Sequence, residues 1–285
     1  MSKAVNPGAS AKRILVIKLS ALGDFVLAMG AMRVIREFHP DAHITLLTTL
    51  PYQDFARASG LFDRIQTNGR PETGKETRAL LKSLRKEQYE VVYDLHTSGR
   101  TRNYFRALNF GFGPKPLWSG HAKGSAFFHS NPAREGMHSI DRLADQLEVA
   151  GIPRDIEPTW PPMPDLSFVR EKFGDRANHQ LSRFGLKGAY GLLVPGASAH
   201  RDAKRWPHER YADLAGMIAD AGIQPVIIGG KAETALAAKL AVVEPRIKNL
   251  TGQTDLFQIV TLAQSAAFVV GNDTGPMHMA TLAGC

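Results

Sequence analysis

The sequence predicts an α/β protein made of two halves, each with a parallel β-sheet covered by helices. Short apolar runs rich in Val, Ile and Leu alternate with helix-length amphipathic segments, a pattern typical of parallel strands joined by helical crossovers. This alternation occurs twice, and a proline-rich stretch separates the two series. The length of 285 residues also favours two domains over one.

The first half begins with a predicted strand at residues 13–18 (RILVIK), and the apolar spacing of residues 25–38 predicts a helix soon after it. Residues 43–48 (HITLLT) are predicted as a second strand. Residues 76–88 are predicted as an amphipathic helix and residues 90–95 (EVVYDL) as a third strand.

Residues 152–164 contain five prolines in thirteen positions, too many for a helix or a central strand, so we expect the interdomain connection there. The predicted domains are residues 1–160 and residues 161–285. In the second half the strands are expected at residues 190–195, 225–229, 247–250 and 267–271, with helices from about Pro207, around 232–241, from Asp255 and from Pro276.

The composition, 44% apolar and 22% charged, is that of a folded globular protein. Cys285 is the single cysteine, which excludes an intrachain disulfide and a thiolate zinc cluster and favours a reducing, cytoplasmic setting. No apolar run approaches the roughly 20 residues that a membrane-spanning helix needs. The formal net charge of +8 suits an anionic partner such as a phosphorylated substrate, a nucleic acid or a membrane surface.

The strongest functional signal is GNDTGPMHMA at residues 271–280, where a predicted strand ends and a helix begins. The backbone N–H groups of Thr274, Gly275 and Met277 would point out of the helix start, and with the helix dipole they predict a phosphate or pyrophosphate site. The alternative is that Asp273 and Thr274 are ordinary helix caps and Gly275 a turn residue.

A second signal, VPGASAHRDAKRWP at residues 194–207, also follows a predicted strand. Its small residues would let the backbone approach a ligand, and Lys204 and Arg205 follow them. It lacks the GxxxxGK[ST] pattern, which disfavours a P-loop nucleotidase. An ordinary surface loop is the alternative, but polar loops at the carboxyl ends of strands in one sheet are expected to share a crevice.

In the first half, KLSALGD at residues 18–24 occupies the corresponding corner between strand and helix. Gly23 eases the turn, and Asp24 stands at the helix start, where the dipole favours its ionised form. An ionised carboxylate at this place could accept a proton. The alternative is a carboxylate that only stabilises the helix.

Together the three segments resemble glycosyltransferase family 9, the ADP-heptose:lipopolysaccharide heptosyltransferases, from about Arg13 to Cys285. The likeness rests on ILVIKLSALGDFVLAMGAMRVIREFHPDAHITLL, on VPGAS with KRWP, and on GNDTGPMHMA, in that order. It implies the GT-B architecture, with two Rossmann-like domains facing a central cleft. It also implies inverting transfer of a heptose or related sugar from ADP-heptose to the inner core or lipid A of lipopolysaccharide.

The resemblance also implies site residues. Asp24 matches the catalytic base, and Lys204 matches a lysine that balances charge on the departing ADP. Glu233 is less securely aligned and would accept hydrogen bonds from ribose hydroxyls. The full set implied for the donor is Ser198, Glu233, Asp273, Thr274, Gly275, Met277 and His278.

Basic residues are concentrated before and after the third predicted strand. Arg100, Arg102, Arg106 and Lys82 fit an acceptor with phosphates and acidic sugars, although a solvated helix face is an equally good interpretation. The same charges would attract anionic lipid, so we expect a cytoplasmic protein, peripheral at the inner face of the inner membrane, with no nucleic-acid partner. His96 could contact a substrate, but a loop histidine without a role is the simpler interpretation.

No DxD motif and no HExxH pair occur, so the expected chemistry uses neither a metal nor another cofactor. The alternatives are a nucleotide-sugar epimerase of similar fold and a noncatalytic nucleotide-sugar-binding fragment. A nicotinamide dehydrogenase is disfavoured because neither half has GxGxxG after its first strand. The chain ends soon after the fourth strand of its second half, whereas family members usually continue, so the C-terminal domain is expected to be incomplete.

Overall fold

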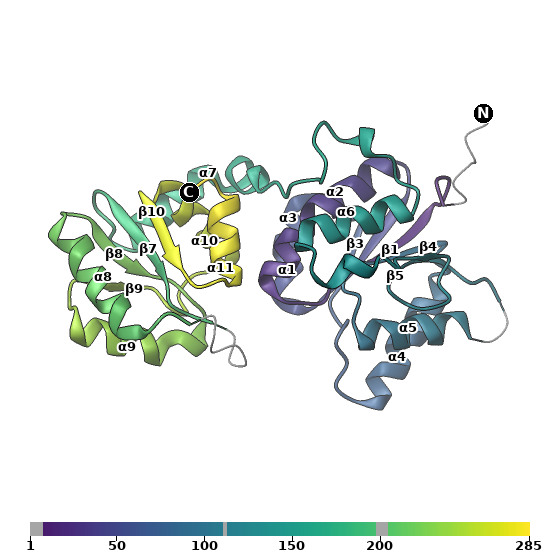
Figure 1. Ribbon diagram of the computed structural model, residues 1–285, viewed down its shortest axis with the longest axis horizontal. Helices are drawn as coiled ribbons and strands as arrows, with labels where there is room; N and C mark the ends of the chain where they lie inside the picture. Colours follow the sequence, from purple (N-terminus) through teal and green to yellow (C-terminus); the bar gives the residue numbers. More distant parts are fainter. Residues whose placement is uncertain (1–7, 111–112, 198–204) are drawn as a thin grey trace. The chain divides into compact units, whose positions relative to one another are not determined.

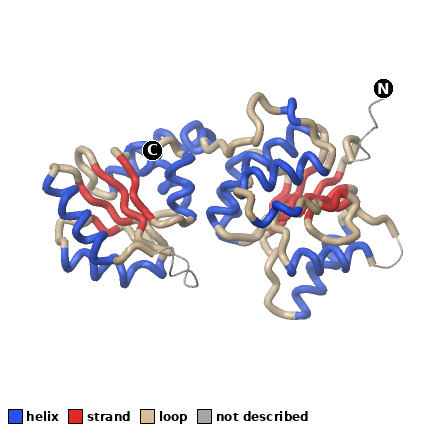
Figure 2. The backbone as a smooth tube through the Cα atoms, in the orientation of Figure 1, coloured by secondary structure: helices blue, strands red, loops and turns tan. Residues whose placement is uncertain are grey.

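The computed structural model describes residues 8–110, 113–197 and 205–285. The chain divides into two compact units, Met1–Pro164 (unit 1) and Asp165–Cys285 (unit 2), each with its own β-sheet. Figure 1 and Figure 2 show that helices flank the sheet of each unit on both faces. The predicted α/β fold with parallel sheets is confirmed.

The sheet of unit 1 has six strands in the order β3-β2-β1-β4-β5-β6, and every neighbouring pair is parallel. The strands are β1 (Arg13–Ile17), β2 (His43–Leu47), β3 (Arg64–Gln66), β4 (Val91–Asp94), β5 (Leu117–Gly120) and β6 (Phe127–Phe128). In the centre, Ile14 lies opposite Ile44 on one side and Val91 on the other, and all three are fully buried or nearly so. Continuous apolar strands suit this position because both faces of the sheet are covered.

The helices of unit 1 are α1 (Leu22–Leu27), α2 (Met29–Phe38), α3 (Gln53–Ser59), α4 (Gly74–Lys86), α5 (Gly99–Asn109) and α6 (Ser139–Val149), with short 3₁₀ turns at Leu50–Tyr52, Pro132–Glu135 and Arg154–Ile156. Figure 1 shows α4 and α5 on one side of the sheet and α1, α2 and α6 on the other. The helix expected over residues 25–38 is instead two helices, which meet at Ala28, the C-cap of α1 and the N-cap of α2.

The proline-rich segment after α6 packs against the helices of unit 1. Trp160 Nε1 donates a hydrogen bond to Glu148 Oε1 (2.8 Å), and Arg33 forms an ion pair with Glu157 (2.6 Å). A Cβ atom at Gly30 would lie 2.1 Å from the carbonyl oxygen of Pro162, so only glycine admits the segment this close to α2. The segment is therefore held by unit 1 over most of its length.

Unit 2 has a four-stranded parallel sheet in the order β10-β7-β8-β9. Its elements are α7 (Ser167–Arg183), β7 (Tyr190–Val194), α8 (His208–Asp220), β8 (Gln224–Ile227), a 3₁₀ turn (Lys231–Glu233), α9 (Thr234–Val243), β9 (Lys248–Asn249), α10 (Leu256–Ser265), β10 (Phe268–Gly271) and α11 (Gly275–Leu282). All strands and helices predicted for the second half are confirmed, with the last helix beginning one residue earlier than expected.

The sequence prediction lacked the helices α3, α5, α6 and α7 and the strands β3, β5 and β6. The strands β3, β5 and β6 span two to four residues, too few to show a periodic pattern. Their places in the sheet come from pairing with longer neighbours. Among the residues that the structure describes, no helix has both the length and the apolar content to cross a membrane.

Candidate active site

The first candidate is Asp24, which lies in the first turn of α1, just beyond the carboxyl end of β1. Its side chain is exposed, and its Oδ2 accepts a long hydrogen bond (3.4 Å) from the backbone N–H of Ala21. The preceding Gly23 is buried against the turn. Asp24 therefore both caps α1 and presents a carboxylate to solvent at the edge where ligands of parallel α/β sheets bind.

Lys18, the first residue after β1, adds a cation to this edge. It is only 5% exposed, and its Nζ donates a hydrogen bond to the carbonyl oxygen of Leu95 (2.9 Å). Burial lowers the pKa of Lys18 to about 8, and the nearby carboxylates of Asp24 and Asp94 partly oppose this shift. At neutral pH Lys18 is therefore mainly protonated, so a buried positive charge stands near the Asp24 carboxylate.

Asp94 and His96 come from the carboxyl end of β4, the strand next to β1. Burial raises the pKa of Asp94 to about 6, although its Oδ1 accepts hydrogen bonds from the backbone N–H groups of Thr97 (2.9 Å) and His96 (3.2 Å). Burial, with the positive charges of Lys18 and Arg70, lowers the pKa of His96 to about 4. The His96 ring is thus neutral at physiological pH and acts as a hydrogen-bonding group.

The structure places His96 close enough to Asp24 for the two side chains to interact electrostatically. The sequence had suggested a loop histidine without a role. Lys18, Arg70 and Asp94 were not predicted. Lys18 and Asp94 did leave a signal in the sequence, since each is a charged residue at the end of a buried apolar strand. Charges in such positions are seldom buried without a purpose.

In unit 2, Asn272 joins the two polar loops that the sequence predicted to meet. It is 6% exposed and follows β10, whose neighbour in the sheet is β7. Its Nδ2 donates to the carbonyl oxygens of Pro195 (2.9 Å) and Gly196 (3.3 Å). Its Oδ1 accepts from the backbone N–H of Trp206 (3.0 Å) and from the hydroxyl of Tyr211 (3.1 Å). All the hydrogen-bonding capacity of this amide is used: three bonds hold loop backbone and the fourth comes from the Tyr211 side chain on α8.

The start of α11 carries the predicted phosphate-binding signal. Thr274 is the N-cap in an extended conformation, Gly275 is the first helical residue, and Pro276 is the second. The N–H groups of Gly275 and Met277 belong to the first turn, where helical N–H groups lack intrahelical partners. Asp273 Oδ1 lies 3.0 Å from His278 Nε2, which places these two predicted residues in direct contact.

Glu233 lines a cavity of about 310 Å³ at the carboxyl ends of β7 and β8. Its Oε2 accepts a hydrogen bond from the backbone N–H of Gly230 (2.8 Å). A Cβ atom at Gly196 would lie 2.8 Å from Glu233 Cγ, so the absence of a side chain there gives Glu233 its position. The remaining lining comes from both loops and the helices after them: Pro195, Gly196, Ala197, Arg205, His208, Ala232, Ala235, Leu236 and Lys239.

Two predicted residues, Ser198 and Lys204, lie outside the described residues. The four predicted acceptor residues are exposed on α4 and α5. Arg100, in the first turn of α5, donates a hydrogen bond to the carbonyl oxygen of Pro71 (2.9 Å). Lys82 lies on α4, while Arg102 and Arg106 lie farther along α5 and are not brought into the Asp24 cluster by any hydrogen bond or ion pair within the described ranges.

No group of three or more His, Cys, Asp or Glu side chains is placed to hold a metal ion within residues 8–110, 113–197 and 205–285.

Comparison with known proteins gives consistent results. Residues 77–283 match the model of Glycosyltransferase family 9 (heptosyltransferase). The lipopolysaccharide core heptosyltransferase OpsX of Haemophilus influenzae is 25% identical over 96% of this chain and 77% of its own length. Lipopolysaccharide heptosyltransferase 2 of Escherichia coli is 29% identical over 94% of this chain and 79% of its own. A solved family 9 glycosyl transferase of Veillonella parvula has the same fold, with a TM-score of 0.75, 22% identity, and coverage of 98% of this chain and 80% of that one.

Proposed function

We propose that this chain, which belongs to glycosyltransferase family 9 (heptosyltransferase), transfers a heptose from ADP-heptose to a hydroxyl of the lipopolysaccharide core. Membership of the family makes the chain a glycosyltransferase, and the names of its curated relatives support the choice of sugar and acceptor. It also favours transfer over the nucleotide-sugar epimerase reaction that the fold alone would allow.

In the proposed reaction Asp24 is the general base. It takes the proton of the acceptor hydroxyl while that oxygen attacks the anomeric carbon, on the face opposite the leaving diphosphate. Its exposed position at the carboxyl end of β1 supports this role, because a base must reach a bound substrate. The buried cation of Lys18 lies near this side chain, since Asp24 raises the pKa of Lys18 against the effect of burial.

We place the donor in unit 2. The N–H groups at the start of α11 would bind the diphosphate, and Glu233 would accept hydrogen bonds from the ribose in the cavity beside Gly196. Asp273 and His278, in contact with each other, would orient the sugar or the phosphates. Ser198 and Lys204 are assigned to the diphosphate from the family resemblance, and Lys204 would offset the charge that grows on departing ADP.

We further propose that transfer needs no metal ion, because a lysine and a helix N-terminus together can balance the charge of a diphosphate. The acceptor would be bound in part by Arg100, with Arg102, Arg106 and Lys82 contributing to its phosphates or acidic sugars. Since such an acceptor is anchored in lipid, the enzyme would work in the cytoplasm at the inner face of the inner membrane.

The observation that carries this proposal is the family match over residues 77–283, together with a solvent-facing carboxylate at the carboxyl end of β1. The test is ADP release from ADP-heptose, measured with and without a deep-rough lipopolysaccharide acceptor and repeated with a chelator. Release that depends on the acceptor and persists in the chelator supports the proposal. Conversion of the sugar without an acceptor would indicate an epimerase, and binding without turnover a noncatalytic protein.

A further inference from the structure

One face of unit 1 carries a concentration of positive charge. Nine basic residues lie on α4, on α5 and in the segment after α5, and all are exposed: Lys75, Arg78, Lys82, Arg85, Lys86, Arg100, Arg102, Arg106 and Lys115. We call this set the basic face. Residues 74–86 and 99–115 contain one acidic residue, Glu76, so these segments have a net charge of 9 − 1 = +8, equal to the formal net charge of the whole chain.

Acidic neighbours do not neutralise the basic face. Within the ranges that the structure describes, none of its nine residues forms an ion pair with a carboxylate. The carboxylates that follow α4 in the chain are occupied elsewhere. Glu87 pairs with Arg64 (2.6 Å), Glu90 accepts from the backbone N–H groups of Lys12 and Arg13, and Asp94 is buried. Apart from Glu76, the basic face therefore has no neutralising carboxylate among its described neighbours and keeps a strong positive potential.

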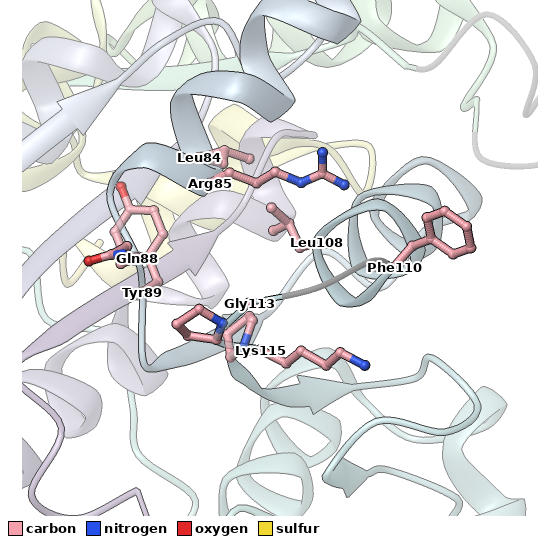
Figure 3. A pocket seen from close by; sticks show the side chains of 10 residues that line it. Leu84, Arg85, Gln88, Tyr89, Leu108, Phe110, Gly113 and Lys115 are labelled. Atoms are coloured by element: carbon pink, nitrogen blue, oxygen red, sulfur yellow. The ribbon is translucent and has the colours of Figure 1, made fainter.

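At one end of the basic face the structure has a cavity of about 420 Å³. Its wall is mixed: Leu84, Leu108 and Pro116 are apolar, Gln88 and the Tyr89 ring add polar atoms, and Arg85 and Lys115 are cations. In Figure 3 the side chains of Arg85 and Lys115 lie on either side of Leu108, and Phe110 stands beyond them. Phe110, the residue after α5, is 82% exposed.

Such a combination of an exposed aromatic ring, a partly apolar hollow and clustered cations is uncommon on a surface that faces only water. An exposed Phe costs hydration free energy unless something covers it, and clustered like charges repel one another unless an anionic surface faces them. A bilayer with anionic headgroups meets both needs, because cations bind the headgroups and an aromatic ring enters the interfacial layer.

We propose that the basic face and Phe110 dock unit 1 onto an anionic phospholipid bilayer. The reason for docking rests on the proposed function, since a lipid-anchored acceptor would be reached there, but the binding itself depends only on the residues named. Both helices begin at the sheet edge that carries Asp24 and end at the cavity, which lies beside the starts of β4 and β5. Docking along their length leaves the Asp24 edge open beside the bilayer.

The test is sedimentation of the full chain with vesicles, without donor or acceptor. Vesicles of phosphatidylcholine alone are compared with vesicles that also contain phosphatidylglycerol, at low and at high salt. The test variant is Lys86→Gln/Lys115→Gln, two residues outside the proposed catalytic and substrate-binding set. The matched control is Arg183→Gln/Lys187→Gln, which removes two exposed charges from the corresponding edge of unit 2, just before β7.

We expect the wild type to bind only the anionic vesicles and to be released by salt. The Lys86→Gln/Lys115→Gln variant should bind about 30-fold more weakly, because each basic residue near an anionic surface contributes about fivefold to partitioning. Phe110→Ala should weaken binding to the anionic vesicles severalfold at low salt, because it removes apolar contact and leaves every charge in place. The control variant should bind as the wild type does, and all variants should have wild-type circular dichroism.

Equal binding to both vesicle types, no binding at all, or equal losses in the test and control variants would overturn the proposal. Transfer to an acceptor stripped of its acyl chains is measured in parallel. If the Lys86→Gln/Lys115→Gln variant loses this soluble transfer but keeps vesicle binding, the face belongs to the acceptor and not to the bilayer. Absence of soluble transfer in the wild type would refute the proposed reaction while leaving the vesicle result to stand by itself.

Discussion

The two units place different chemistry at the carboxyl edges of their sheets. In unit 1 the edge combines an exposed carboxylate, Asp24, with the buried ionisable groups of Lys18 and Asp94. In unit 2 the corresponding edge is organised by Asn272, a buried amide that does not titrate. Among the described residues, the buried Lys, His, Asp and Glu side chains are all in unit 1. One edge is therefore suited to moving protons and the other to holding an anion at fixed charge.

The largest effect is expected from Asp24→Asn, which tests whether the carboxyl edge of unit 1 transfers a proton. Asn keeps the size of the side chain and can still cap α1, but it cannot accept a proton, so we expect kcat to fall by about a thousandfold. ADP affinity, measured by calorimetry, should stay within about twofold of the wild type, because the donor is assigned to unit 2. Full turnover by this variant would remove Asp24 from the proton-transfer step.

The counterpart in unit 2 is Lys204→Ala, which tests the assignment made from resemblance. If Lys204 balances charge on the departing ADP, the variant should lose both donor affinity and rate, with kcat/KM falling by about a hundredfold. Lys239→Ala, on the rim of the Glu233 cavity, is the control with a smaller expected loss. A pure KM effect at Lys204 would mean that the lysine binds ground state and transition state equally.

Acidification should destabilise unit 1 before it destabilises unit 2. His39 of unit 1 is 2% exposed, its Nε2 lies 2.8 Å from the Tyr93 hydroxyl, and burial lowers its pKa from 6.5 to about 4. The folded state thus prefers the neutral ring. The contribution of His39 to the free energy of unfolding is therefore complete above about pH 6.5. It is lost as the pH falls towards 4, and the total loss is about 3 kcal/mol.

Asp94 acts in the opposite direction, since its raised pKa lets the folded state take up a proton more readily than the unfolded state. We expect the histidines to prevail, because burial also lowers the pKa of His96 and of His129. Hydrogen exchange at pH 7 and pH 5 should show amides of unit 1 losing protection before those of unit 2. His39→Gln should reduce the difference, and equal loss in both units would contradict the assignment.

The smallest effect is expected from Asn272→Ala, which tests whether the carboxyl edge of unit 2 depends on a group that does not titrate. It removes three hydrogen bonds with loop backbone and one with the Tyr211 hydroxyl, and should destabilise unit 2 by about 2 kcal/mol, with ADP affinity falling severalfold. Because an amide does not titrate, the loss should be the same at pH 6 and at pH 8. Thermal unfolding followed at both pH values provides the measurement. A loss of stability that depends on pH would contradict the assignment of these hydrogen bonds to an uncharged amide.

Much of the fold follows from local pattern. The long buried strands β1, β2, β4 and β7 were predicted from continuous apolar runs, and the helices α4 and α10 from their spacing and starts. The strands β5 and β6 were not, because their pairing depends on neighbours distant in sequence. Contacts of this kind leave no periodic signal in two to four residues.

The location of candidate site residues was predictable where a short motif carries them, as with Asp24 at the start of α1 and Thr274 at the start of α11. It was not predictable where function depends on packing. The buried state of Lys18 follows from its hydrogen bond to Leu95, 77 residues away in sequence. In the same way, Asn272 holds Pro195 and Gly196 across adjacent strands, and only the sheet order brings them together.

Gly196 offers a route by which donor preference could change during evolution or in engineering. Any side chain at this position would displace Glu233, whose Cγ would stand 2.8 Å from the new Cβ atom. The shape of the cavity that we propose for the nucleoside thus depends on a residue that contributes only backbone to it. A library of substitutions at position 196 could therefore be screened with different nucleotide sugars. Such a screen would look for variants with a changed preference for the base or the ribose while Glu233 itself is kept.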